Sequence, residues 1–216
     1  GGLLNLLEAG RRGRLRQVVF ASTGGAIYGE QERFPADEGH PVWPLSPYGV
    51  SKLASERYLW VYHSEYGLDA TCLRYANVYG PRQNPHGEAG VVAIFHHRLL
   101  RGQQPVINGD GEQTRDYVFV GDVVRANLGA LGREGYRIYN VGTGVETDVN
   151  VLYDSIRRAL GSEVRAVHRP GEAGGQRRAR LTAARLGEEL GVTVSVPLED
   201  GIRRTAEWFH DVHAPG

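Results

Sequence analysis

Short apolar runs rich in β-branched residues alternate with helical patterns along almost the whole chain, and this alternation limits the possible folds more than any other feature. We expect strands at residues 16–22, 68–75, 105–109, 116–120, 136–142 and 163–168. We expect helices at residues 3–9, 47–66, 91–100, 123–131, 149–160, 182–190 and 198–210. Gly67 would end the second of these helices, Asp122 would cap the fourth, and Thr147 or Asp148 would cap the fifth. Strands that alternate with helices form parallel sheets covered by helices. The sequence therefore predicts an α/β fold.

The composition excludes several kinds of protein. Lys+Arg and Asp+Glu number 25 each, so the net charge is zero and there is no electrostatic footprint for nucleic acid. The basic run at residues 11–16 is better explained as a solvated helix end than as a phosphate track. No apolar run approaches the roughly 18 residues that a membrane span needs. The only cysteine, Cys72, lies in an apolar strand and fits a reducing compartment, so we expect a cytoplasmic protein.

Two long loops rich in Gly and Pro, at residues 23–46 and 76–90, interrupt this pattern. Loops of this length in a compact domain are usually functional. The first loop follows a strand that ends in Ser22 and Thr23. Because ligands of open parallel sheets bind beyond the carboxyl ends of the strands, these hydroxyl groups are well placed for a ligand. The glycines after them allow the backbone to approach it closely.

The stretch SPYGVSK, residues 46–52, places a tyrosine and a lysine on one helical face. Ser46 can cap a helix and Pro47 suits its first position. Tyr48 and Lys52 then stand four residues apart. A phenol has a pKa of roughly 10, and a neighbouring ammonium lowers it, so the pair could act as an acid/base near neutral pH. The alternative is a Tyr and a Lys on a solvated helix face.

Six motifs occur in a fixed order. They are STGGAIYG (22–29), SPYGVSK (46–52), RYANVYGPRQ (74–83), QTRDYV (113–118), YNVGTG (139–144) and RPGE (169–172). In this combination the chain resembles, over essentially its whole length, the extended short-chain dehydrogenase/reductase family and most of all the UDP-glucose 4-epimerases. The resemblance implies the C-terminal part of a Rossmann-type parallel sheet with helices on both faces, plus a smaller mixed α/β lobe that binds the substrate.

The resemblance implies NAD as cofactor and a role for each matching residue. Tyr48 would take the proton from the 4-hydroxyl of the sugar, and Lys52 would lower the pKa of Tyr48 and bind the nicotinamide ribose. Thr23 would hydrogen-bond the reacting oxygen, with Ser22 as the alternative because the glycine pair shifts the register against some relatives. Nicotinamide contacts would come from Ser22, Tyr48, Lys52, Tyr75 and Ala76.

A UDP-sugar is the implied substrate. Asn77, Arg115 and Arg169 would contact its diphosphate, for which the planar fork of arginine is suited. Arg115 could instead pair with a neighbouring acid. Positions where the family holds the sugar, the uracil base and the ribose are occupied by Val91, Val92, Ile107, Asn108 and Glu172.

The implied reaction is NAD-dependent epimerisation at C4. The 4-hydroxyl proton goes to Tyr48 while the C4 hydride goes to NAD, the keto sugar turns, and both return to the other face. The first alternative is a 4,6-dehydratase or decarboxylase of the same family, but those relatives carry carboxylates where this chain has Gly24 and Gly25. The second alternative is a non-catalytic fragment that binds sugar nucleotides.

The chain departs from the family in two ways. The G-x-x-G-x-x-G turn that binds the pyrophosphate after the first strand of relatives is absent, and the chain has no Met. We therefore expect on the order of a hundred residues of a parent enzyme to be missing. The expected domains are residues 1–80, the rest of the NAD-binding domain, and residues 81–216, mainly the substrate lobe, of which 116–145 return to the Rossmann sheet. Ala76 replaces the aromatic residue of some relatives, which predicts a wider pocket.

Relatives commonly dimerise through the helix that corresponds to residues 47–66. This helix carries large apolar residues on all sides, which predicts burial on more than one side and a homodimer. They are Leu53, Tyr58, Leu59, Trp60 and Tyr62. No metal is expected, because the adjacent His96 and His97 point about 100° apart on a helix.

Overall fold

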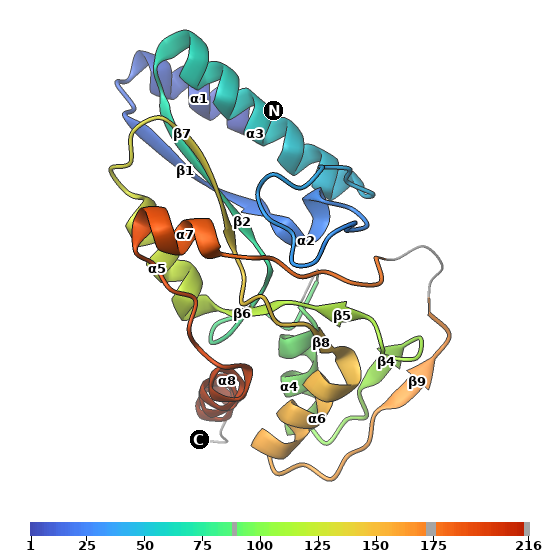
Figure 1. Cartoon of the computed structure of the whole chain (residues 1–216). Coiled ribbons are helices and arrows are strands. Elements are labelled where there is room, and N and C mark those ends of the chain that lie inside the picture. The colour runs from blue at the N-terminus through green and yellow to red at the C-terminus, as the bar shows by residue number, and fades with distance from the viewer. Residues whose placement is uncertain (88–89, 172–175, 214–216) are drawn as a thin grey trace.

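The computed structural model describes residues 1–87, 90–171 and 176–213. A three-stranded parallel sheet lies at its centre, in the order β1 (Gln17–Thr23), β2 (Asp69–Tyr75), β7 (Tyr136–Val141) (Figure 1). Thr23 pairs with Tyr75, and Tyr75 with Val141, so the three strands end level with one another. The fold class predicted from the alternating pattern is confirmed.

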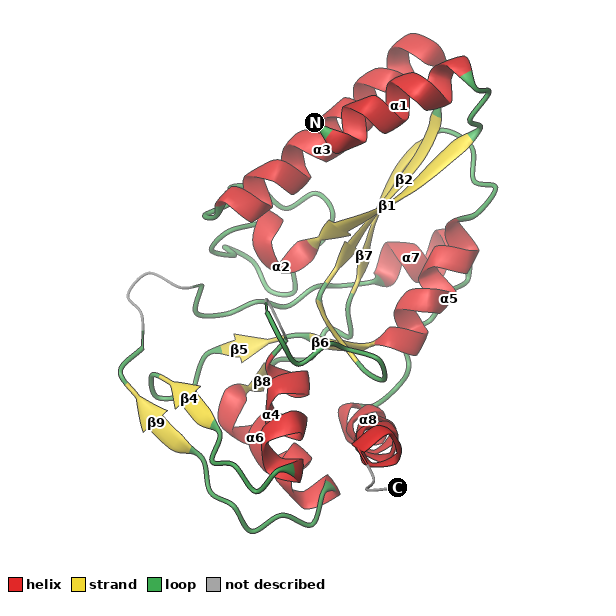
Figure 2. Cartoon of the chain, turned by 180° about the vertical axis from the view of Figure 1, so that it is seen from behind, coloured by secondary structure: helices red, strands yellow, loops and turns green. Residues whose placement is uncertain are grey.

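Helices cover both faces of this sheet (Figure 2). On one face, α1 (Gly2–Arg12) and α3 (Pro47–Tyr66) pack over Ala70 and Cys72 of β2. On the other, α5 (Val120–Ala130) and α7 (Ala184–Leu190) pack over Leu73. The period of two along a strand sends neighbouring side chains to opposite faces, and because helices cover both faces β2 is buried from Ala70 to Arg74. Burial raises the pKa of the Cys72 thiol to about 12, so this cysteine is inert.

A second lobe lies beyond the carboxyl ends of the strands (Figure 1). Its helices α4 (Val91–Leu100), α6 (Val149–Ala159) and α8 (Leu198–His213) share a core that includes Phe95, Leu152 and Ile202. Three small sheets complete it: β3 (Asn77–Tyr79) with β6 (Tyr117–Phe119), β4 (Val106–Asn108) with β9 (Val167–Arg169), and β5 (Thr114–Arg115) with β8 (Thr147–Asp148). None of the helices among the described residues is long and apolar enough to span a membrane.

Helix α3 forms for the local reasons that its sequence suggests. Ser46 Oγ accepts a hydrogen bond of 3.1 Å from the Gly49 N–H, Pro47 occupies the first position, and Gly67 ends the helix at φ 67°. Gly49 also permits close packing, because a Cβ there would lie 2.5 Å from the Ala26 carbonyl oxygen in α2 (Gly24–Ile27).

Some sequence expectations were wrong in detail. The two long loops contain the short helix α2 and the short strand β3. The strand expected at 163–168 is limited to Val167–Arg169, because its partner β4 offers only three residues. Asp122 does not cap α5, which begins two residues earlier. Its buried carboxylate pairs with Arg125 and accepts a hydrogen bond of 3.1 Å from the Val196 N–H, so tertiary contacts outweigh the capping preference.

His96 makes folding stability depend on pH. The imidazole is fully buried between α4 and α8, stacks on Phe209 and bonds the Val92 carbonyl through Nδ1 at 2.8 Å. Burial lowers the pKa of His96 to about 4. At pH values between about 4 and about 6.5, His96 binds a proton in the unfolded state but not in the folded state. The free energy of unfolding therefore decreases as the pH falls through this range.

We therefore expect wild-type protein to lose roughly 2–3 kcal/mol of unfolding free energy through His96 between about pH 7 and pH 4.5. Urea denaturation at the two pH values measures this loss. His96→Leu should remove it, whereas His210→Gln, at an exposed site, should not. An unchanged pH dependence in His96→Leu would contradict the assignment.

Candidate active site

Tyr48 and Lys52 lie together beside the end of β1. Lys52 Nζ is 5.6 Å from the centre of the Tyr48 ring and donates a hydrogen bond of 2.8 Å to the Ala21 carbonyl oxygen. Tyr48 is 55% exposed, so a ligand can approach this residue. The helical spacing of four residues thus brings the expected acid/base pair to the carboxyl end of the sheet.

Thr23 and Asn77 flank the backbone of Gly25. A Cβ on Gly25 would lie 3.5 Å from Asn77 Oδ1 and 3.9 Å from Thr23 Oγ1. The two side chains come from the ends of adjacent segments, since Thr23 ends β1 and Asn77 follows β2 by two residues. Polar groups that are distant in the sequence therefore gather where the parallel strands end.

Ser22 points away from this group. Its side chain is 3% exposed, and Oγ donates a hydrogen bond of 2.5 Å to Glu56 Oε1 inside the protein. Successive residues of a strand face opposite sides, so Ser22 and Thr23 cannot serve the same ligand in the same way. Of the two hydroxyl groups, only that of Thr23 lies, like Asn77 Oδ1, within 4 Å of the position that a Cβ on Gly25 would take.

A buried polar network lies behind these residues, and the sequence analysis missed it. Glu56 and Arg74 form an ion pair of 2.6 Å at 1% and 3% exposure. Arg74 Nη1 donates to the Tyr28 hydroxyl at 3.0 Å, and that hydroxyl donates to Asn140 Oδ1 at 2.7 Å. Burial by itself lowers the pKa of Arg74. The hydrogen bonds to Glu56 and the charge of Glu56 have a larger opposite effect, so the pKa of Arg74 is above its ordinary value. An arginine inside the apolar run DATCLRY was the available signal.

Tyr75 and Ala76 continue β2 toward the same end. The Tyr75 hydroxyl hydrogen-bonds Asn127 Oδ1 at 3.1 Å, and burial raises its pKa. The Ala76 N–H donates to the Val141 carbonyl at 2.9 Å, which extends the pairing of β2 with β7 by one residue. Both residues are half-buried beside the Thr23 group.

Arg115 is a half-buried cation on β5. Its Nη1 donates to the Thr114 carbonyl oxygen at 2.7 Å, and burial lowers the pKa of the guanidinium. Glu112 pairs with Arg177 at 3.2 Å, and the Asp116 carboxylate is fully engaged elsewhere. Within the described ranges neither acid forms an ion pair with Arg115. This guanidinium therefore keeps its remaining donors for another anion.

The other expected substrate residues fall into two groups. Asn108 and Arg169 are opposite each other in the β4–β9 pair, and both are exposed. Val92 and Ile107 are 2% exposed and belong to the core of the second lobe, with Val91 packed against it. Glu172 lies outside the described residues. Sequence alone could not separate these groups, because packing decides which apolar side chain faces the core.

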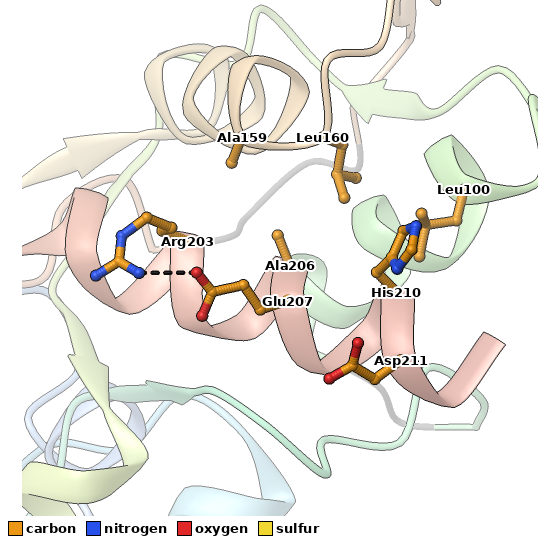
Figure 3. Close-up of a pocket in the computed structure, with 8 residues that line it drawn as sticks. All are labelled: Leu100, Ala159, Leu160, Arg203, Ala206, Glu207, His210 and Asp211. Carbon is orange, nitrogen blue, oxygen red and sulfur yellow. Dashed lines mark hydrogen bonds and ion pairs between the residues drawn. The ribbon is translucent and has the colours of Figure 1, made fainter. Parts of the chain in front are cut away.

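One cavity lies away from all of the expected site residues. A space of about 530 Å³ is bounded by α6, α8 and the end of α4, with the ion pair of Arg203 and Glu207 at its rim (Figure 3). Its lining is Leu100, Ala159, Leu160, Arg203, Ala206, Glu207, His210 and Asp211. None of these residues was expected to touch cofactor or substrate. Within the part of the chain that the structure describes, no cluster of His, Cys, Asp or Glu could hold a metal ion.

The family model of the NAD dependent epimerase/dehydratase family matches residues 1–142. The chain belongs to this family. The UDP-glucose 4-epimerase of Mycolicibacterium smegmatis is 47% identical over 97% of this chain and 67% of the relative. The structure of UDP-glucose 4-epimerase with UDP-glucose from Thermotoga maritima aligns with a TM-score of 0.95 at 47% identity, over 98% of this chain and 69% of that one. The structure of the Thermus thermophilus UDP-glucose 4-epimerase in complex with NAD aligns with a TM-score of 0.90 at 45% identity, over 97% of this chain and 68% of that one.

These findings confirm the resemblance drawn from the six motifs. They also show that the chain spans about two thirds of the length of these relatives. NAD is the cofactor of the family. The residues of the chain fit the nicotinamide end of NAD, because Tyr48 and Lys52 lie beside the strand end, where Gly25 carries no side chain between Thr23 and Asn77.

The pyrophosphate-binding glycine turn has no counterpart in the described fold. Gly129, Gly132 and Gly135 repeat the glycine spacing by coincidence. They lie at the end of α5 and before β7, at the amino end of the sheet, so they cannot form a turn between a strand and the helix that follows it.

The Glu56–Arg74 pair gives a direct stability prediction. Arg74→Met would leave the Glu56 carboxylate buried without its cation, so we expect the free energy of unfolding to fall by about 3–5 kcal/mol. Urea denaturation at neutral pH measures this change. Arg57→Met, at an exposed position of α3, should change it by less than about 0.5 kcal/mol. Equal losses in the two variants would contradict the argument from burial.

Proposed function

We propose that the protein interconverts UDP-glucose and UDP-galactose by NAD-dependent epimerisation at C4. The observation that carries this proposal is that Lys52, beside the Tyr48 ring, donates to the Ala21 carbonyl oxygen, two residues before Thr23 at the carboxyl end of β1. Identities of 45–47% to UDP-glucose 4-epimerases over nearly the whole chain support it. The proposal assigns the activity of the family to this protein. The chain contributes the Tyr48–Lys52 pair and the second lobe to the active site.

The residues of the chain would control the proton and the position of the sugar. Tyr48, as the phenolate favoured by the Lys52 ammonium, accepts the proton of the sugar 4-hydroxyl and later returns it on the other face. Thr23 Oγ1 hydrogen-bonds the same oxygen and holds C4 in place. When bound, NAD supplies reversible acceptance of the C4 hydride. We assign this role to Thr23 rather than Ser22, because the Ser22 hydroxyl is buried against Glu56.

We also propose that the second lobe binds the nucleotide part. Asn77, Arg115 and Arg169 would hold the diphosphate, and Asn108, which is paired with Arg169 between β4 and β9, would contact the sugar or the uracil base. Val91, Val92, Ile107 and Glu172 stay predictions from the family. This proposal divides the chain as the sequence suggested, into residues 1–80 and 81–216, with 116–145 returning to the sheet.

Calorimetric titration of UDP-galactose into the protein tests the substrate assignment. We expect binding that Arg115→Ala weakens roughly 10- to 100-fold, since hydrogen bonds between charged groups contribute about 1.5–3 kcal/mol. Arg101→Ala, an exposed arginine in the same lobe, is the matched control. With NAD present, Tyr48→Phe should preserve binding and abolish interconversion. Tight binding without turnover in the wild type would favour the non-catalytic alternative, and absence of binding would refute the substrate assignment.

A homodimer through α3 is a further part of the proposal. One side of the helix packs on the sheet through Leu59 and Tyr62, while Trp60 and Val61 are 49% and 40% exposed on the other. An exposed tryptophan next to an exposed valine suits an interface with a second copy. The single free and buried cysteine, Cys72, is consistent with a cytoplasmic location, which we also propose.

Sedimentation velocity at micromolar concentration tests the dimer. We expect the wild type to sediment as a dimer and Trp60→Glu as a monomer, because a buried unpaired charge opposes association. Val151→Glu alters an exposed valine on α6 and should leave the dimer intact. A monomeric wild type would exclude this part of the proposal without affecting the assignment of the active site.

A further inference from the structure

Glu56 belongs to the same helix as the acid/base pair. It follows Lys52 by four residues and Tyr48 by eight, so it occupies the next turn of α3 on the side that faces the sheet. Tyr48 is 55% exposed, whereas Glu56 is 1% exposed. The helix therefore offers its acid/base group to a ligand at one end and buries a carboxylate two turns later.

This carboxylate spans two strands just before they end. Glu56 Oε1 accepts from Ser22 Oγ at 2.5 Å and from Arg74 Nε at 3.0 Å, and Oε2 accepts from Arg74 Nη2 at 2.6 Å. Ser22 and Arg74 are directly paired in the β1–β2 register. The next residues along these strands are Thr23 and Tyr75, both at the proposed site.

We propose that Glu56 is a positioning residue, which acts through Ser22 to fix the helix that carries Tyr48 and Lys52 against the strand end that carries Thr23. This inference rests on the proposed function, which places these three residues at the reacting oxygen. Glu56 itself touches neither substrate nor cofactor in this assignment, because it is enclosed by Ser22, Arg74 and the sheet.

The energetics of buried ion pairs support a geometric role. A buried pair of charges gains little stability over apolar residues of the same shape, because desolvation offsets much of the attraction. Its contacts are nevertheless directional, and each hydrogen bond here has a different donor. Catalysis depends strongly on such placement, since an error of about 1 Å can lower the rate roughly 100-fold.

The network also reaches the third strand. Arg74 binds Tyr28, which follows α2, and Tyr28 binds Asn140 of β7. The Tyr136 hydroxyl of β7 donates to the Glu56 carbonyl oxygen at 3.1 Å. Glu56 is thus held to each strand of the central sheet, whereas the hydrogen bond of Lys52 goes to the Ala21 carbonyl oxygen of β1. A shift of α3 along the sheet would break several of these contacts together.

Ser22→Ala is the primary test, because it cuts the link to the strand end and leaves the ion pair of Glu56 and Arg74 intact. With NAD and UDP-galactose we expect kcat to fall roughly 10- to 100-fold while KM changes less than about threefold. Glu56→Gln should have a similar effect, and the double variant should be no worse than the more severe single variant. Glu65→Gln, an exposed acid on the same helix, should match the wild type.

Amide hydrogen exchange provides a readout that does not depend on turnover. In Ser22→Ala we expect exchange at residues 17–30 and 46–56 to become about tenfold faster, with α4 and α6 unchanged. If exchange becomes faster throughout the protein, the contact stabilises the whole fold and the proposal is wrong. Unchanged exchange would also contradict the proposal, because the contact would then fix nothing locally.

The kinetic measurements and the hydrogen exchange measurements together distinguish a failure of this proposal from a failure of the proposed function. If the wild type has no turnover, the epimerase assignment fails, and local exchange still decides whether Glu56 fixes the helix to the strand end. If the wild type is active and the Ser22→Ala and Glu56→Gln effects add independently, Ser22 acts by itself and the proposal is wrong.

Discussion

The proposed active site depends on the buried ion pair between Glu56 and Arg74. One partner lies on the helix that carries Tyr48 and Lys52, and the other lies on the middle strand of the sheet. Separating them would leave a lone charge in the interior, at a cost of about 3–5 kcal/mol. The position of α3 on the sheet is therefore restricted by electrostatics as well as by apolar packing. The same contacts fix the positions of Tyr48 and Lys52, because both residues lie on α3 within about two turns of Glu56.

A second buried carboxylate, Asp116, joins the sheet to the second lobe. Its oxygens accept hydrogen bonds from the N–H and hydroxyl of Thr143, from Gly144 N–H and from Leu181 N–H, at 2.6–3.2 Å. Burial raises the pKa of Asp116, and these hydrogen bonds oppose the shift. The Asp116 carbonyl also accepts from Asn77 N–H at 2.8 Å. One residue thus fixes the loop after β7, the segment before α7 and the start of β3, beside the neighbouring Arg115.

Local signals in the sequence were reliable where one element decides its own ends. Ser46, Pro47 and Gly67 marked the bounds of α3, and Asp148 caps α6 as one of the two residues expected to do so. Such signals failed where distant segments compete for the same group. Asp122 had the sequence context of a cap, yet its carboxylate binds Arg125 and Val196. Asn140 likewise joins distant segments, because it donates to the Ala36 carbonyl oxygen and accepts from the Tyr28 hydroxyl.

The sequence by itself determined the α/β class, the family and the Tyr48–Lys52 pair, because periodicity, motif order and helical spacing are properties of neighbouring residues. Only the tertiary structure decided that Thr23 and Asn77 flank Gly25 while Ser22 binds Glu56, that neither Glu112 nor Asp116 forms an ion pair with Arg115, and that Val92 and Ile107 face the core. These outcomes depend on which strands pair and in which register. A shift of one residue would turn each strand side chain to the opposite face, and no local pattern records that choice.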